Sequence, residues 1–208
     1  MIQIIPIEYG KSVLPENMIF LNRNSETLRE ITFKIYLIIM DNKYILVDAG
    51  CETMPGFEMR DFIGTVQALE NMNLKPEKIT DVIITHSHHD HIECVKYFEN
   101  AVIHIQQDEY EGGKKYIPNG FKLNIFNDEF LIGENLKIIK IGGHTKGSCI
   151  VEIKDDNKKY IVAGDECYIR ECLTQKIPTA ASSDNKASIE FIEKYSSSEY
   201  IVLLCHDK

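Results

Sequence analysis

Short apolar segments separated by polar turns dominate the chain, and this pattern predicts a protein rich in β-strands. Two regions each contain a pair of such segments joined by a turn of aspartate, asparagine or lysine residues, which is typical of a β-hairpin. The paired segments are Ile31–Met40 with Tyr44–Val47, and Ser148–Ile153 with Tyr160–Ala163.

The remaining apolar segments predict further strands and several helices. Strands are expected at residues 1–8, as an edge strand, and at 82–84, 101–105, 130–132, 136–141 and 200–204. Helices are expected at residues 61–72, 92–98, 108–111 and 186–195. Residues 9–29 are polar and irregular, so they are predicted to form a long loop over a functional site.

The two predicted hairpins belong to an internal repeat. Each hairpin delivers an aspartate, Asp48 or Asp165, at the end of its second strand. Each is followed, after a connection and a helix, by an apolar strand that ends in a histidine, His86 or His206. Two such halves facing each other predict an α+β fold with a sheet-on-sheet core and helices on the outside.

Length and charge narrow the classes of protein and partner. The chain has 208 residues, of which 44% are hydrophobic, and this fits one domain over residues 1–208 with a filled core. The formal net charge of −9 disfavours a nucleic acid as partner, because a phosphate backbone attracts basic surfaces. No apolar run approaches the roughly 20 residues that cross a bilayer, so no membrane partner is expected.

The cysteines and the N-terminus indicate a reducing compartment. None of the six cysteines forms a C-x-x-C pair, and their spacing does not suggest a disulfide framework. The start of the chain, Met1–Pro6, lacks the basic residues and the long apolar core of a signal peptide. The protein is therefore predicted to be soluble and cytoplasmic, with free thiols.

The segment Thr85–His91 carries the strongest chemical signal in the chain. Besides Asp90 it contains four of the seven histidines: His86, His88, His89 and His91. A solvated histidine-rich turn is the plain alternative. However, histidines rarely cluster without a function, and the neutral imidazole nitrogen is the commonest metal ligand. Nitrogen and oxygen donors of this kind suit zinc, with iron, cobalt and manganese as alternatives.

Three further candidate ligands stand where predicted strands end. His144 follows Gly142 and Gly143, which let the backbone bend sharply and approach other groups closely. Asp165 and His206 each lie at the end of an apolar segment. One such residue alone is more often the polar end of a strand, but together with the histidine-rich segment these residues provide enough ligands for a metal centre.

The sequence His86-Ser87-His88-His89-Asp90-His91 resembles the H-x-H-x-D-H signature of the metallo-β-lactamase superfamily. The resemblance covers nearly the whole chain and implies a four-layer αβ/βα sandwich, with two mixed β-sheets flanked by helices. It also implies a centre for two metal ions, in which the Asp48 carboxylate orients the ligand imidazoles without binding a metal itself. The implied ligands are His86, His88 and His144 for one ion, Asp90, His91 and His206 for the second, and Asp165 as the bridge.

The resemblance implies hydrolysis of an activated acyl compound, such as an ester, lactone, thioester or lactam, by water that two zinc ions activate. Within the superfamily, the N-acyl homoserine lactone lactonases are the most similar locally. Tyr168 stands three residues after Asp165, as a tyrosine does in those enzymes, and residues 106–111 also resemble their sequence. We therefore expect a small acyl substrate, with catalytic roles for Asp90 and Tyr168, the Tyr168 hydroxyl stabilising an oxyanion.

The chain departs from those lactonases in one region. It is shorter, and residues 51–60 form only a brief connection where the lactonases have an apolar insertion. A thioester hydrolase similar to glyoxalase II, a mononuclear iron persulfide dioxygenase and a non-catalytic binding domain therefore stay open, as does the oligomeric state, a homodimer included. His89 is expected to fill a variable position, and His104 to have a local partner within a strand.

Overall fold

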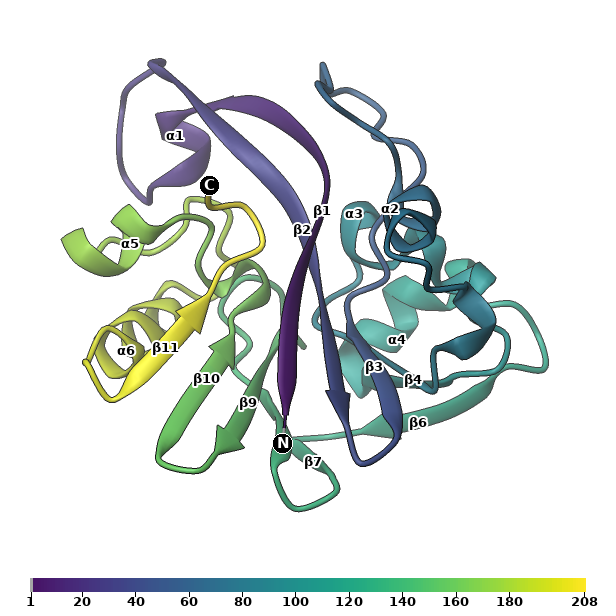
Figure 1. Cartoon of the computed structure of the whole chain (residues 1–208). Helices are drawn as coiled ribbons and strands as arrows, with labels where there is room; N and C mark the ends of the chain where they lie inside the picture. Colours follow the sequence, from purple (N-terminus) through teal and green to yellow (C-terminus); the bar gives the residue numbers. More distant parts are fainter. Residues whose placement is uncertain (1) are drawn as a thin grey trace. The chain divides into compact units, whose positions relative to one another are not determined.

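The strands form two mixed sheets in the computed structural model, which describes residues 2–208 (Figure 1). The first sheet has the order β1-β2-β3-β4-β5-β6 and the second the order β11-β10-β9-β8-β7. The strands of the first sheet are β1 (Gln3–Pro15), β2 (Leu28–Met40), β3 (Lys43–Val47), β4 (Asp81–Ile84), β5 (Val102–Gln106) and β6 (Lys122–Phe126). Those of the second are β7 (Glu129–Ile132), β8 (Leu136–Lys140), β9 (Cys149–Asp155), β10 (Lys158–Val162) and β11 (Tyr200–Leu203).

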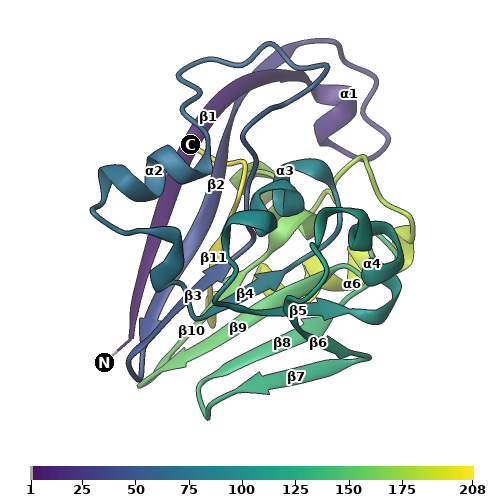
Figure 2. The same ribbon diagram turned by 90° about the vertical axis from the view of Figure 1, so that its right-hand side faces the viewer.

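Short helices accompany both sheets. Figures 1 and 2 show α2 (Thr65–Asn71), α3 (His89–Ile92) and α4 (Gln107–Gly113) gathered on one side of β3 to β6. Beside the second sheet, α5 (Arg170–Gln175) contacts α6 (Asn185–Tyr195). The other helical segments are α1 (Glu16–Ile19) and the 3-10 turns η1 (Pro76–Lys78), η2 (Glu93–Tyr97), η3 (Lys114–Tyr116) and η4 (Gly164–Glu166). Within residues 2–208, no helix is both long enough and apolar enough to cross a membrane.

The chain divides into two compact units, and each contains one copy of the predicted repeat. The first unit combines the chain up to Ser12 with Thr32–Phe126, and the second combines Val13–Ile31 with Asn127–Lys208. In the first unit, β2 pairs antiparallel with β3, and β3 pairs parallel with β4. In the second, β9 pairs antiparallel with β10, and β10 pairs parallel with β11. The internal repeat is therefore confirmed at the level of strand pairing.

The first hairpin forms because its turn residues accept a left-handed backbone. Met40 pairs with Lys43, so only Asp41 and Asn42 lie in the turn, with φ angles of 49° and 61°. Positive φ at both central residues is what a two-residue turn between twisted strands needs, and Asn and Asp tolerate it better than most residues. The parallel strand β4 that follows is buried at all its positions, as its continuous apolar run indicates.

The prediction of a long loop at residues 9–29 is wrong. The strand β1 continues to Pro15, α1 follows at once, and β2 already begins at Leu28. The polar residues Lys11 and Ser12 interrupt the hydrophobic pattern that would predict a strand here. They are part of β1 because they form hydrogen bonds with a segment distant in the sequence. The backbone of Lys11 exchanges two hydrogen bonds of 2.8 Å with Arg60, and the Ser12 hydroxyl donates to the Glu58 carbonyl. Of the predicted edge strand, Met1 lies outside the described residues.

Two predicted helices differ from the structure. The helix expected at residues 61–72 covers only Thr65–Asn71, because Asp61 and Gly64 have positive φ angles, 47° and 75°, that a right-handed helix cannot contain. The helix expected at residues 92–98 begins earlier, at His89, and continues from Glu93 as a 3-10 turn. The structure also contains β6 and α5, for which the sequence pattern did not predict an element.

A buried carboxylate joins three elements of the first unit. The Asp81 side chain is only 3% exposed and accepts hydrogen bonds from Lys43 (3.0 Å), Thr80 (2.8 Å) and His104 (2.9 Å). His104 thus has the local partner that was expected of it. Burial by itself would raise the pKa of Asp81, but the hydrogen bonds from His104, Thr80 and Lys43 outweigh it and lower the pKa to about 2.

We expect Asp81→Asn to destabilise the metal-free protein by about 2 kcal/mol at pH 7. The folded pKa of about 2 lies below the ordinary value of 3.8, so the ionised form favours folding. This stabilisation is complete above about pH 5 and is lost as the pH falls through 2. Urea unfolding at pH 7 and pH 3 measures this stabilisation. The difference in the free energy of unfolding between variant and wild type should be roughly half as large at pH 3 as at pH 7.

Asp156→Asn is the matched control, because Asp156 is an exposed turn residue with a φ of 52° that asparagine tolerates. It should leave the free energy of unfolding within about 0.5 kcal/mol of wild type at both pH values. An Asp81→Asn difference that does not depend on pH would contradict the assignment.

Candidate metal centre

Asp48 organises the histidine-rich segment of the first unit. It follows β3 with a left-handed φ of 65° and is fully buried. Its Oδ1 accepts a hydrogen bond of 2.8 Å from the Thr85 amide, and its Oδ2 accepts one of 2.9 Å from the Thr85 hydroxyl. Oδ2 also lies 2.7 Å from Nδ1 of His91. Because a carboxylate accepts, the His91 proton belongs on Nδ1, and Nε2 presents its lone pair on the opposite side of the ring.

His86 and His88 face each other just beyond β4. His86 is buried, and its Nδ1 lies 3.1 Å from the Thr85 hydroxyl. Its Nε2 lies 3.0 Å from Nδ1 of His88, whose ring stands nearly perpendicular to it at 82°. Two ring nitrogens at this spacing suit two ligands of one ion, since zinc–nitrogen bonds are about 2.0–2.1 Å long.

Asp90 and His91 form a second pair at the start of α3. Asp90 Oδ2 lies 3.4 Å from His91 Nε2. The Tyr9 hydroxyl donates a hydrogen bond of 2.8 Å to the Asp90 carbonyl and so ties this turn to β1. The first unit therefore brings together all of the ligands predicted in its part of the chain.

His144 owes its position to the two glycines before it. Gly142 has a φ of 77°, which favours glycine. A Cβ atom on Gly143 would lie 2.4 Å from a Glu166 oxygen and 2.5 Å from the Ser188 hydroxyl, so a larger residue there would displace these two side chains. The His144 ring is fixed by a 2.5 Å hydrogen bond between its Nδ1 and the Ala181 carbonyl. Its Nε2 therefore points away from that carbonyl.

Asp165 lies between the two histidines of the second unit. Its Oδ1 lies 3.1 Å from His206 Nε2, and its Oδ2 lies 3.6 Å from His144 Nε2. The carboxylate thus presents one oxygen to each imidazole, which is the arrangement that a bridging ligand needs. All three side chains are nearly fully buried.

Tyr168 packs against the same two histidines. Its ring centre lies 5.2 Å from that of His206 and 5.9 Å from that of His144, with edge-to-face geometry in both cases. Its side chain is largely buried, and it follows closely in the chain after η4, the turn that carries Asp165. Tyr168 therefore lies next to both histidines, in agreement with its position three residues after Asp165 in the sequence.

Two buried glutamates support these residues and were missed in the sequence. Glu109 accepts hydrogen bonds from Ser87, and Glu166 accepts hydrogen bonds from the backbone of Gly143 and His144. Burial raises the pKa of Glu166 to about 7. The hydrogen bonds that the carboxylate accepts favour its ionised form and oppose this rise, but burial has the larger effect. Glu166 is the neighbour of Asp165 in the chain, but nothing in its local sequence shows where its side chain points.

His89 and the cysteines, which are not among the proposed ligands, pack against neighbouring groups. His89 Nε2 lies 2.8 Å from the Thr53 carbonyl, and its ring packs edge-to-face on Tyr116. All six cysteines are buried. Burial, with a contribution from the negative charge of Asp90, raises the pKa of Cys51 to about 12, so its thiol is unreactive.

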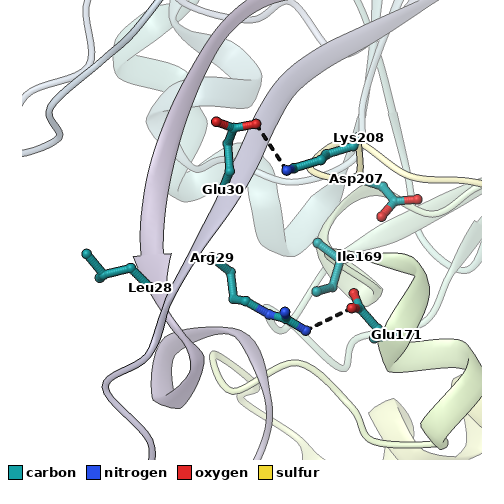
Figure 3. A pocket seen from close by; sticks show the side chains of 7 residues that line it. All are labelled: Leu28, Arg29, Glu30, Ile169, Glu171, Asp207 and Lys208. Atoms are coloured by element: carbon teal, nitrogen blue, oxygen red, sulfur yellow. Dashed lines mark hydrogen bonds and ion pairs between the residues drawn. The ribbon is translucent and has the colours of Figure 1, made fainter.

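A pocket of about 340 Å³ lies in the second unit (Figure 3). Its wall includes Ile169 and Asp207, which directly follow Tyr168 and His206 in the chain. Charged side chains dominate the lining, and Figure 3 shows two ion pairs across it, Arg29 with Glu171 at 2.8 Å and Lys208 with Glu30 at 3.2 Å. The complete lining is Leu28, Arg29, Glu30, Ile169, Glu171, Asp207 and Lys208.

The donor atoms of both units fit divalent metal ions. Histidines that bind a metal usually hold the other ring nitrogen on a carboxylate, a carbonyl or another acceptor, which sets the orientation of the ring. His91 does so through Asp48, and His144 does so through the Ala181 carbonyl. Imidazole and carboxylate donors in this ratio suit zinc and also iron, manganese or cobalt.

Known proteins resemble this chain in sequence. A "probable metallo-hydrolase" of Methanocaldococcus jannaschii is 30% identical over 150 residues, which cover 72% of this chain and 64% of that protein. An N-acyl homoserine lactonase of Rhizobium rhizogenes is 27% identical over 142 residues, which cover 57% of this chain and 51% of that protein. The matched part of the chain thus spans between half and two thirds of the length of these two relatives.

The fold and the family follow from two further comparisons. A solved N-acyl homoserine lactone hydrolase, with its product N-hexanoyl-L-homoserine at the catalytic metal centre, superimposes with a TM-score of 0.84 at 20% identity, covering 98% of this chain and 92% of that one. This confirms the expected fold of two mixed sheets flanked by helices. The sequence model described as the metallo-beta-lactamase superfamily matches residues 34–206. The chain therefore belongs to the metallo-β-lactamase superfamily.

Proposed function

We propose that this protein is a metal-dependent hydrolase of small lactones or esters, with a dinuclear metal centre. The single observation that carries the proposal is the Asp165 carboxylate, which offers one oxygen to His144 and the other to His206. Such a carboxylate is suited to link two cations. The proposed ligands are His86, His88 and His144 for one ion, Asp90, His91 and His206 for the other, and Asp165 for both.

The chemistry of the reaction divides between the ions and the protein. Bound divalent cations would lower the pKa of water to near neutrality and polarise the acyl carbonyl group. The Tyr168 hydroxyl would donate a hydrogen bond to the oxygen on which negative charge develops. The Asp90 carboxylate would accept a proton from the attacking water and return it to the leaving alcohol oxygen. A lactone and one water then give one hydroxy acid.

The substrate side of the proposal concerns the pocket whose lining includes Ile169 and Asp207, the residues that follow Tyr168 and His206 in the chain. Its lining by Arg29, Glu171 and other charged groups suits a short or polar substituent better than a long acyl chain. The brief connection at residues 51–60, which contains no helix or strand, supports the same view. We therefore propose substrates with small or polar acyl groups.

Metal analysis combined with a substrate panel tests the proposal. We expect about two divalent metal ions per chain, loss of activity on treatment with a chelator, and recovery when zinc is added back. Lactones and esters should be hydrolysed faster than thioesters or lactams. Across lactones with acyl chains of increasing length, kcat/KM should stay nearly constant, because each buried CH₂ group would otherwise add about 0.8 kcal/mol, roughly a fourfold gain.

The other candidate functions predict different results. One iron ion per chain, with oxygen consumption on a persulfide and no hydrolysis, would indicate a dioxygenase. Preference for a thioester would indicate the glyoxalase II type of reaction. Metal binding without turnover of any compound in the panel would leave a binding domain, and a steep rise of kcat/KM with chain length would contradict the polar substrate.

A further inference from the structure

In each unit, one segment that carries proposed ligands is held by a buried glutamate that is not itself a proposed ligand. Glu109 does this in the first unit and Glu166 in the second. Their exposed fractions are only 3% and 0%. A buried carboxylate is unfavourable unless it accepts several hydrogen bonds, so the groups that donate to it are informative.

Glu109 binds the residue between two of the proposed ligands. Its Oε2 accepts a hydrogen bond of 2.8 Å from the Ser87 amide and one of 2.7 Å from the Ser87 hydroxyl. Ser87 stands between His86 and His88, whose ring nitrogens face each other at 3.0 Å. One carboxylate oxygen thus fixes both the backbone and the side chain at the centre of this pair.

Helix α4 gives Glu109 a rigid support for that contact. A Cβ atom on Gly112 would lie 2.9 Å from the Ser87 hydroxyl oxygen, and one on Gly113 would lie 2.8 Å from the Ile92 Cδ1. The backbone of the helix therefore presses directly against the segment that carries the histidines. Larger residues at these two positions would separate the helix from Ser87 and lengthen the Glu109 hydrogen bonds.

Glu166 makes the corresponding contacts in the second unit. Its carboxylate accepts hydrogen bonds from the Gly143 amide at 3.1 Å and the His144 amide at 3.3 Å, and also from the Ser148 hydroxyl. It thereby ties both ends of the loop that carries His144 to the turn that carries Asp165. In each unit, a buried glutamate thus binds the backbone of a segment that carries proposed ligands.

We propose that Glu109 and Glu166 are positioning residues that hold the imidazoles in place before the metal arrives. The inference rests on the proposed metal centre. If the acceptor is removed, the ligand loop gains freedom that metal binding must then take away, so the affinity for the metal falls. Loss of such supporting hydrogen bonds typically lowers metal affinity 10- to 100-fold.

The test compares Glu109→Ala with Glu109→Gln. Zinc affinity is measured by competition with a chromophoric chelator, and unfolding temperatures are measured with and without zinc. We expect Glu109→Ala to weaken zinc binding about 10- to 100-fold and to reduce the rise in unfolding temperature that zinc produces. Glu109→Gln keeps an acceptor oxygen for Ser87, so it should recover most of the affinity. The same two substitutions at Glu166 test the second unit.

Glu111→Ala is the control, because Glu111 lies on the same helix but is exposed and forms a surface ion pair with Lys114. It should bind zinc as wild type does. A purely structural role would lower the unfolding temperatures with and without zinc equally, and that result would overturn the inference, as would equal losses in Glu109→Ala and Glu109→Gln. If the wild-type protein binds no zinc, the proposed function fails instead.

Discussion

His88→Ala is expected to lower kcat/KM for the best lactone or ester substrate by at least about a thousandfold, equivalent to about 4 kcal/mol. The nitrogen that faces His86 at 3.0 Å is removed, so one of the two proposed ions loses a ligand. Elemental analysis should show that the metal content falls toward one ion per chain. The side chain is exposed, so the folded structure should survive the change.

His89→Ala is the matched control for that experiment. His89 is the next residue in the chain, but its ring contacts the Thr53 carbonyl and Tyr116 rather than a proposed ligand. Metal content and kcat/KM should stay within about threefold of wild type, as for a surface residue of this kind. If His88→Ala retained full turnover and both ions, the proposed ligand set would be wrong.

Tyr168→Phe is expected to lower kcat by about a hundredfold while metal content stays unchanged. The change removes only the hydroxyl, and the ring can keep its edge-to-face packing on His144 and His206. Because the lost hydrogen bond forms mainly in the transition state, kcat should fall while KM changes little. Steady-state kinetics on a lactone, with metal analysis of the same sample, measure both quantities.

Tyr160→Phe makes the same chemical change on β10, outside the proposed site. It should leave kcat unaltered. A Tyr168→Phe protein with wild-type kcat would mean that Tyr168 only packs against the histidines. A loss of metal in that variant would mean that it supports the ligands and does not act on the substrate.

The local features of the fold were predictable because they depend on neighbours in the chain. The hairpin turn at Asp41 and Asn42 needs positive φ angles that these residues tolerate, and the apolar run of β4 is what a strand buried on both faces requires. The candidate ligands could be predicted in the same way, because they follow apolar segments that the sequence identifies as strands. The repeated hairpins then indicated two similar units, which the strand pairing confirms.

Features that depend on distant partners were not predictable. The polar end of β1 is a strand because Lys11 pairs with Arg60, and this pairing leaves no trace in local hydrophobicity. The helix expected from residue 61 begins only at Thr65, because Gly64 takes a positive φ where the apolar stripe alone indicated a helix. At the end of β1 the tertiary environment overrode the local pattern, whereas at residue 61 the backbone conformation of Asp61 and Gly64 did so.

By itself the sequence determined the kind of chemistry, since imidazoles and carboxylates with this spacing and order are donor atoms for metals whatever surrounds them. Only the tertiary structure decided how those donors are held. It placed Asp48 on His91, set Asp165 between His144 and His206, and brought Glu109 to Ser87. These contacts join residues far apart in the chain, and their geometry exists only after the strands and helices that carry them have packed.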